Sequence, residues 1–234
     1  MTQAPRYFAL IPAAGVGARM GATSPKQYLK IGGKPMLRHT LDAFLSSELI
    51  AHTFVVVSPD DPYIDTVAPN HGVTILRCGG ASRMESVRNG LAVLANTLSG
   101  ADRVLVHDAA RPGLTAELIE KLITGTGDHP AGGLLALPVV DTVKRGIDGE
   151  ACGTVPRNGL WLAQTPQMFR YELLRDALAA VSDPNSITDD ASAVESLGLS
   201  PKLVEGHPRN LKVTLPDDIR IAEMYLAVSH PELV

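Results

Sequence analysis

Short apolar runs alternate with amphipathic stretches along most of the chain. Several of the runs are apolar at nearly every position, which is typical of parallel strands buried on both faces. The predicted strands are Tyr7–Ile11, Thr53–Ser58, Val73–Arg77, Arg103–His107 and Gly133–Leu137. Between them, apolar residues at helical spacing predict helices, one of which begins at a capping-box pattern of Ser82 and Glu85. The helical positions are Leu37, Leu41, Phe44 and Leu45; Val87, Leu91, Leu94 and Leu98; Ala116–Thr124; Tyr171–Val181; and a last helix starting near Thr214 and Asp217. This alternation predicts an α/β fold with a doubly wound, mostly parallel sheet.

One segment, Pro138–Trp161, departs from the alternation. It holds two short β patterns, Val139–Val143 and Thr154–Val155, on either side of a turn at Gly146–Gly149. Because an isolated hairpin is only marginally stable in water, we expect it to need a surface to pack on. That surface is either its own domain, which would make it an edge hairpin, or a partner subunit, and the sequence leaves both open.

Composition narrows the class of protein. With 234 residues, 45% hydrophobic and 20% charged, the chain can bury a sizeable core as one large domain or two small ones. A net charge of -4 argues against a dedicated nucleic-acid binder but not against a small anionic ligand. We expect no membrane contact, because no apolar run approaches the roughly 20 residues that a membrane helix needs. Cys78 and Cys152 fit no metal-binding spacing and suit a reducing cytoplasm.

A glycine-rich loop, Ile11–Gly21, directly follows the first predicted strand. Its small residues would let backbone N–H groups approach a phosphate closely. The glycines resemble a dinucleotide fingerprint, but Pro25 follows where a helix should continue, and no acidic residue ends a strand about 20 residues later. Arg19 and Lys26 flank the loop, which suits a more highly charged phosphate chain, and no Walker sequence is present.

A second candidate site follows the strand at Arg103–His107. Ligands of open α/β sheets bind beyond the carboxyl ends of the strands, and Asp108 stands at such an end. A carboxylate there would hold Mg²⁺, and Arg111 would clamp an anion; alternatively, Asp108 only caps the following turn. His107 is interpreted as structural, since a single histidine at a strand end is weak evidence for a ligand.

Several polar clusters late in the chain carry little information when each is taken alone. Thr188 is most simply a helix N-cap, and Gln164–Gln167 is most simply a loop before a helix. The other clusters are Asp141-Thr142, Arg157-Asn158-Gly159 and Asn210–Val213.

Together, the glycine loop with Pro25–Tyr28, the strand end His107–Pro112, Arg157–Trp161 and Thr188-Asp189 resemble one family. The chain is similar over nearly its whole length to 2-C-methyl-D-erythritol 4-phosphate cytidylyltransferases. The resemblance implies transfer of CMP from CTP to a branched polyol phosphate with release of pyrophosphate, in the non-mevalonate isoprenoid route. It implies Mg²⁺ as cofactor, with other divalent cations as substitutes. It also implies a Rossmann-like nucleotidyltransferase fold, one domain over residues 1–234 with residues 138–161 as a protruding β-arm, and a cytoplasmic homodimer joined through that arm.

The resemblance also implies roles for individual residues. The CTP site would contain Pro12, Ala13, Ala14, Gly15, Gly79, Gly80, Ser86 and Ala109. The catalytic residues would be Arg19, Lys26, Arg157 and Lys212. The polyol phosphate would be bound by Asp108, Arg111, Thr142, Arg157, Thr165, Thr188 and Lys212, with Asp108 also facing the metal and with Thr142 and Arg157 reaching the neighbouring subunit's site. The chain departs from some members at Ala81, where they have an acidic residue, so no base contact is assigned to that side chain.

Charge considerations favour the same chemistry. A phosphate monoester and a triphosphate repel each other, so a catalyst needs cations between them and alignment for in-line attack. The attacking phosphate is already ionised, which agrees with the lack of a convincing nucleophile–base set in the sequence. Three other hypotheses remain: a nucleotidyltransferase for another sugar or polyol phosphate, a nicotinamide-dependent reductase, and a non-catalytic nucleotide sensor.

Overall fold

The computed structural model describes residues 4–15, 25–183 and 187–227. Its centre is a seven-stranded sheet in the order β11-β7-β10-β6-β1-β4-β5. The strands are β1 (Tyr7–Pro12), β4 (Ile50–Val56), β5 (Val73–Leu76), β6 (Arg103–Val106), β7 (Gly133–Pro138), β10 (Trp161–Arg170) and β11 (Lys202–Glu205). All neighbours pair in parallel except β10, which runs antiparallel to both β6 and β7. The predicted α/β fold with a mostly parallel sheet is therefore confirmed.

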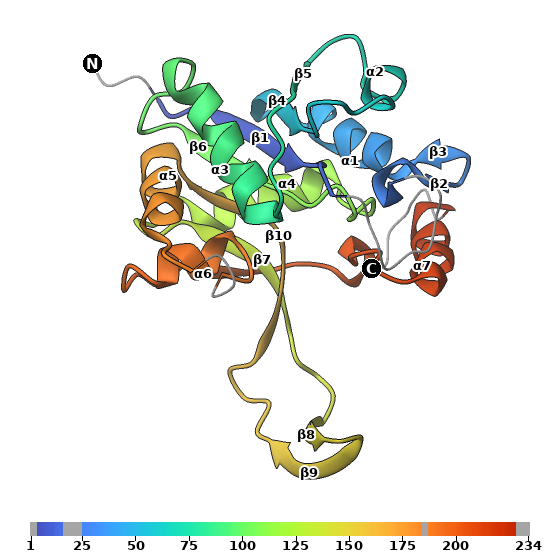
Figure 1. Cartoon of the computed structure of the whole chain (residues 1–234). Coiled ribbons are helices and arrows are strands. Elements are labelled where there is room, and N and C mark those ends of the chain that lie inside the picture. Colours follow the sequence, from blue (N-terminus) through green and yellow to red (C-terminus); the bar gives the residue numbers. More distant parts are fainter. Residues whose placement is uncertain (1–3, 16–24, 184–186, 228–234) are drawn as a thin grey trace.

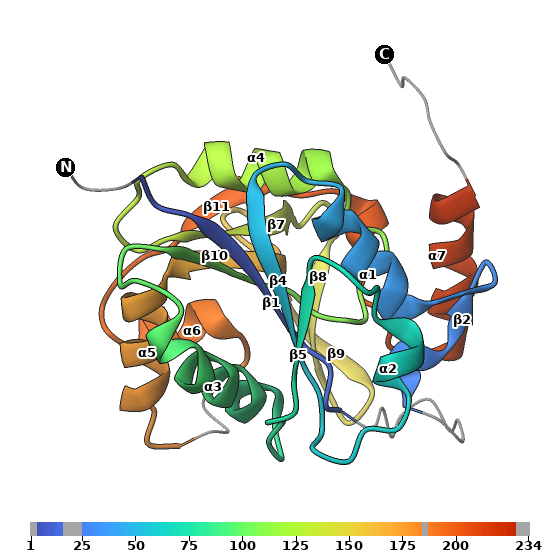
Figure 2. The same cartoon turned by 90° about the horizontal axis from the view of Figure 1, so that it is seen from above.

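Helices cover both faces of the sheet (Figures 1 and 2). The α-helices are α1 (Met36–Leu45), α2 (Ile64–Val67), α3 (Arg83–Val93), α4 (Ala116–Thr126), α5 (Tyr171–Ala180), α6 (Asp190–Glu195) and α7 (Pro216–Ala227). Alternate residues of β1 show the layering: Leu10 packs in the cluster with α3, α5 and α6, whereas Ile11 packs in the cluster with α1, α2 and α4. A smaller apolar cluster joins α7 to the short hairpin of β2 (Lys30–Ile31) and β3 (Lys34–Pro35).

The start of α3 shows how local sequence sets an element beside the glycine pair Gly79-Gly80. The Ser82 side chain accepts a hydrogen bond from the N–H of Glu85 at 3.1 Å, as the capping pattern predicts. The Glu85 carboxylate accepts from the N–H of Ala81, one residue before the position expected in a capping box. The cap therefore fixes the backbone of Ala81 as well as the helix itself.

Two strands and one helix start differ from prediction. The segment Gln164–Gln167 is not a loop but part of β10, and β11 was not predicted at all. Gln164–Gln167 was not predicted as a strand because central strands are usually apolar. Here the buried amide of Gln167 donates to Asp189 and accepts from the N–H of Ala191. Those partners are distant in the sequence, so the local sequence does not show them. Thr188 is not the N-cap of α6; Asp189 is, in a full capping box with Ser192.

The segment between β7 and β10 forms a long arm (Figure 1). At its tip, β8 (Val143–Ile147) and β9 (Glu150–Val155) pair antiparallel around a turn at Asp148 and Gly149, both with positive φ. The hairpin stands away from the sheet rather than folding onto it as an edge hairpin. Within the described residues, none of the helices has the length and apolar character that crossing a bilayer requires.

Candidate active site

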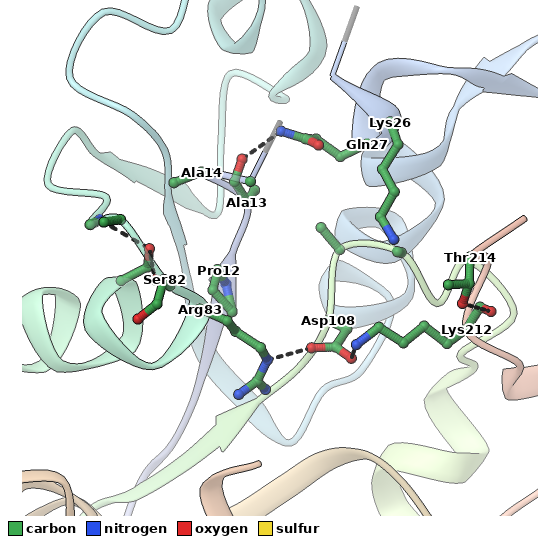
Figure 3. Close-up of a pocket in the computed structure, with 16 residues that line it drawn as sticks. Pro12, Ala13, Ala14, Lys26, Gln27, Ser82, Arg83, Asp108, Lys212 and Thr214 are labelled. Atoms are coloured by element: carbon green, nitrogen blue, oxygen red, sulfur yellow. Dashed lines mark hydrogen bonds and ion pairs between the residues drawn. The ribbon is translucent and has the colours of Figure 1, made fainter. Parts of the chain in front are cut away.

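A cavity of about 500 Å³ opens at the carboxyl ends of β1 and β6 (Figure 3). This is the sheet edge where open α/β folds bind ligands. Its described lining residues are Pro12, Ala13, Ala14, Gly15, Lys26, Gln27, Gly80, Ala81, Ser82, Arg83, Ser86, Asp108, Ala109, Ala110, Lys212 and Thr214. Most predicted CTP-site residues and two predicted catalytic lysines therefore share one cavity.

The floor of the cavity is a backbone cradle formed where β1 ends. The N–H of Ala13 continues the sheet by donating to the carbonyl of Val56 at 2.7 Å, and the Gln27 amide donates to the carbonyl of Ala13 at 2.6 Å. A Cβ on Gly79 would overlap the side chain of Ala14, so only small residues allow these segments to meet. Gly79 thus lies behind Ala14, whereas no atom of the described residues lies within 4 Å of the Cβ position of Gly15.

The wall of the cavity that contains the predicted CTP-site residues Gly80 and Ser86 is fixed by hydrogen bonds from its own loop. The N–H of Gly80 donates to the hydroxyl of Ser86 at 3.0 Å, and that hydroxyl donates to the carbonyl of Ser82 at 2.9 Å. Ser86 is almost fully buried, so its hydroxyl is a rigid part of the wall. The N–H of Ala81 is held by the Glu85 carboxylate at 2.7 Å.

Asp108 is the centre of charge in the cavity. Its carboxylate receives Nε of Arg83 at 2.6 Å and Nζ of Lys212 at 2.9 Å, and Nε of Arg111 lies at 3.6 Å. Burial alone would raise the pKa of Asp108, but the charges of Arg83, Lys212 and Arg111 outweigh burial and hold that pKa well below its usual range. The carboxylate is therefore ionised at neutral pH and organises three cations.

A layer of buried polar groups supports Asp108 from behind. The backbone N–H of Asp108 donates to the hydroxyl of Thr165 at 3.0 Å, and that hydroxyl lies 2.9 Å from Nδ1 of His107. Burial lowers the pKa of His107 to about 3, so the ring is neutral and serves the structure, as the sequence suggested. Arg111 is buried as well, and it donates to the carbonyls of Asn210 and Ala163. Thr165 and Arg111 thus hold the strand end rather than line the cavity.

The two lysines of the cavity come from distant segments. Lys26 begins the short 3₁₀ helix η2 (Lys26–Tyr28), and its ammonium donates to the carbonyl of Val213 at 3.0 Å. The segment that carries Lys212 is anchored by Asn210, whose amide donates to the carbonyl of Thr165 at 2.7 Å. Figure 3 shows the Lys212 side chain reaching the Asp108 carboxylate and the Lys26 side chain directed toward the same part of the cavity. The arrangement concentrates positive charge beside the backbone cradle.

A smaller pocket of about 120 Å³ adjoins this cavity. Its described lining comprises Ser82, Arg83, Met84, Ile187, Thr188, Asp189 and Asp190. Ser82 and Arg83 line both spaces and thus form a shared wall. Thr188, a predicted acceptor-site residue, lies in the smaller pocket.

Comparison with known proteins identifies the family. The family model for 2-C-methyl-D-erythritol 4-phosphate cytidylyltransferase matches residues 7–228. The chain belongs to this family. It is 49% identical over 226 residues to the cytidylyltransferase of that name from Dechloromonas aromatica, covering 95% of this chain and 98% of the relative. It is 52% identical over 221 residues to the cytidylyltransferase of the same name from Chromobacterium violaceum, covering 94% of this chain and 97% of the relative.

Solved structures show the same relationship. A crystal structure of a 4-diphosphocytidyl-2C-methyl-D-erythritol synthase superposes with a TM-score of 0.86 at 44% identity, covering 96% of this chain and all of that one. The crystal structure of the 2-C-methyl-D-erythritol 4-phosphate cytidylyltransferase from Thermus thermophilus superposes with a TM-score of 0.76 at 32% identity. The match covers 94% of this chain and 98% of that one. The chain is thus an enzyme of the nucleotidyltransferase class, which removes the reductase and sensor hypotheses.

Three further residues that the family resemblance implies lie on the arm or outside the described residues. Arg19 falls in residues 16–24, outside the described residues. Thr142 and Arg157 lie on the exposed arm, where the Arg157 guanidinium donates to the carbonyl of Val140. Within one chain, the structure therefore does not bring Thr142 and Arg157 to the cavity.

Sequence reasoning missed Arg83 and Asp190. Nη2 of Arg83 donates to the Asp190 carboxylate at 2.8 Å while its Nε holds Asp108. The one sequence signal was that Arg83 directly follows the N-cap Ser82 and lies three residues after Gly80, at the edge of a predicted nucleotide site. Nothing in the sequence pointed to a partner 107 residues away.

The donor groups fit a magnesium ion that arrives with a nucleotide. Asp108 is the one carboxylate among the described lining residues, and the described chain holds no group of three or more potential metal ligands. Mg²⁺ is commonly bound through one or two carboxylates together with substrate phosphates and water. A single buried carboxylate beside a phosphate-sized cradle matches that pattern.

Proposed function

We propose that the protein transfers CMP from CTP to 2-C-methyl-D-erythritol 4-phosphate and releases pyrophosphate, as a step toward isoprenoid precursors. The main support is the family membership of residues 7–228 combined with a cavity in which Lys26, Lys212 and Asp108 meet a backbone cradle. The cavity volume lies within the ~300–1,000 Å³ typical of small-ligand sites.

In this proposal, CTP lies across the larger cavity. The base is held beside Gly80 and Ser86, and the triphosphate follows the cradle from Pro12 to Gly15 toward Lys26. Ala109, whose side chain is buried at the end of β6, offers a small surface next to the ribose and phosphates. Ala81 has no side-chain acceptor, so recognition of the base rests on backbone groups and the Ser86 hydroxyl.

The acceptor occupies the space between Lys212 and the smaller pocket. Thr188 offers a hydroxyl there, and Arg111 and Thr165 keep Asp108 in place from behind. Arg157 and Thr142 of a neighbouring subunit complete the acceptor site. This last contribution explains why both lie on an exposed arm in a single chain.

The residues act by charge and alignment rather than by forming a covalent intermediate. The acceptor phosphate oxygen attacks the α-phosphorus of CTP in line, the bond to the bridging oxygen breaks, and pyrophosphate leaves. Lys26 and Lys212 reduce the repulsion between the two anions and stabilise the negative charge of the transition state. No side chain has to remove a proton, because the phosphate is already ionised. Asp108 would hold Mg²⁺, which when bound supplies further charge neutralisation.

The exposed arm supports a homodimer as part of this proposal. Val140, Ile147 and Leu162 are 70%, 62% and 60% exposed, although they are large and apolar. Large apolar side chains that are exposed along a projecting segment favour burial against another surface. A second copy is the natural partner, because closed two-fold pairs are the commonest oligomers. We also propose a cytoplasmic location, which two free cysteines support.

The decisive experiment measures pyrophosphate release with omission of each component in turn. We expect release only when CTP, Mg²⁺ and 2-C-methyl-D-erythritol 4-phosphate are all present. A panel of sugar 1-phosphates and other polyol phosphates tests the competing nucleotidyltransferase hypothesis. Faster turnover of one of those acceptors, or folded protein that releases nothing with the full mixture, would overturn the proposed reaction.

A further inference from the structure

Arg83 occupies the wall between the two pockets and joins three segments of the chain. It is the first residue of α3, and its guanidinium binds Asp108 after β6 and Asp190 at the start of α6. The two distances, 2.6 and 2.8 Å, are those of strong charge-assisted hydrogen bonds. A single side chain thus links the nucleotide cavity to the smaller pocket.

The two carboxylates that Arg83 joins are buried, and Asp190 has one charged partner among the described residues. The Asp190 side chain is 1% exposed, and its Oδ1 has no hydrogen-bond partner within the described part of the chain. Burial raises the pKa of Asp190, and the adjacent Arg83 opposes that rise. The position of the Asp190 carboxylate therefore depends on the guanidinium of Arg83, whereas the helix start that carries it is also held by Gln167.

The segment fixed in this way forms most of the smaller pocket. Thr188 and Asp189 directly precede Asp190, and the Gln167 amide donates to the Asp189 carboxylate at 2.7 Å. Gln167 pairs with Val106 on β6, close to Asp108. The pocket wall around Thr188 is thus attached at two points, to β10 through Gln167 and to the nucleotide cavity through Arg83.

We infer that Arg83 is a positioning residue that fixes the smaller pocket relative to the nucleotide cavity, so that an acceptor phosphate meets the α-phosphorus in line. This inference rests on the proposed function. The competing interpretation is an internal ion pair that serves folding alone, since buried ion pairs often add little to the specificity of a site. Only kinetic measurements separate the two, because both interpretations expect some loss of stability.

The first test is Arg83→Lys, which keeps the positive charge but replaces two separately directed N–H groups with one ammonium. We expect kcat to fall by about a hundredfold, as small misplacement of reacting groups commonly causes. The affinity for CTP alone, measured by calorimetry, should change much less. Arg88→Lys is the matched control, because Arg88 is exposed on the same helix and pairs only loosely with Glu85 at 3.8 Å.

The second test is Asp190→Asn, which preserves shape and replaces the charge-assisted hydrogen bond at the α6 end of the link with a neutral one, without touching Asp108. We expect the KM for the acceptor to rise about tenfold as this hydrogen bond weakens, with little change in CTP affinity. If Arg83→Lys does not fold, the Asp190→Asn variant still tests the positioning role.

Lower thermal stability with unchanged kcat and acceptor KM in the folded variants would overturn the positioning role. A parent protein that binds CTP but never releases pyrophosphate would instead overturn the proposed function, and the inference with it. An active parent with unaffected variants would overturn the inference alone.

Discussion

The larger cavity and the arm differ in the contacts that stabilise them. In the cavity, Asp108 is buried and meets Arg83, Lys212 and Arg111 from the same chain. On the arm, large apolar side chains are exposed and the hairpin stands away from the sheet. The proposed nucleotide half of the site is thus preorganised within one subunit, whereas the arm has surface left to bury. This difference predicts that damage to the cavity acts within a subunit and damage to the arm acts between subunits.

Removing the central carboxylate should have the largest effect. Asp108→Ala leaves Arg83 and Arg111 close together without their shared counter-charge, and such a loss commonly costs about 3–5 kcal/mol in the free energy of unfolding. Turnover should disappear as well. Urea unfolding and pyrophosphate release measure the two effects. Asp128→Ala is the control, since Asp128 is 97% exposed and pairs with Arg103 only at 3.4 Å. Equal stability of the two variants would contradict the assigned role of Asp108.

Lys26→Ala should separate catalysis from folding. Its ammonium donates to the carbonyl of Val213 at the cavity edge, so its removal leaves the core intact. We expect turnover to fall by about 10²–10³-fold, as removal of one transition-state contact commonly does. Lys121→Ala, on the exposed side of α4, provides the control. Near-normal turnover of Lys26→Ala would remove this lysine from the mechanism.

Mixing two inactive variants tests whether the arm completes a neighbouring site. If Lys26 acts in its own subunit and Arg157 acts in the partner, a hybrid of Lys26→Ala and Arg157→Ala chains contains one intact site. When equal amounts of the two variants exchange subunits freely, about half of the dimers are hybrids, and each hybrid has one intact site of two. The mixture should then recover about a quarter of the parent's activity. Sedimentation of an Ile147→Asp variant checks the dimer separately. No recovery on mixing, with subunit exchange demonstrated by a labelled chain, would contradict the shared site.

The same contrast explains what could be predicted from the sequence. The strand ends at Pro12 and Asp108 were predicted because apolar runs and their polar ends lie close together in the chain. The strand containing Gln164 and Gln167 was not predicted. Its buried amides donate to His207 and Asp189, which only the folded chain brings close to them. Arg83 was missed for the same reason. The resemblance to a family supplied roles for the arm that no local pattern contained.

The layer behind the cavity also predicts how the stability of the protein depends on pH. Burial lowers the pKa of His107 to about 3, below the value of about 6.5 expected in the unfolded chain. Between these values the unfolded chain binds a proton that the folded chain does not, so acid favours unfolding. The free energy of unfolding should therefore fall by up to about 1.4 kcal/mol per pH unit below pH 6.5 on account of this group.

Urea unfolding between pH 4 and 7 measures that slope, and His107→Gln should flatten it relative to the parent. The depressed pKa of Asp108 acts below this range: its contribution is complete above about pH 4 and is lost only as the pH falls further. The exposed His71→Gln variant is the control for loss of a histidine. An unchanged slope in His107→Gln would mean that His107 can take up a proton in the folded protein. The layer behind Asp108 would then be less firmly closed to water than its hydrogen bonds to Thr165 and Arg111 indicate.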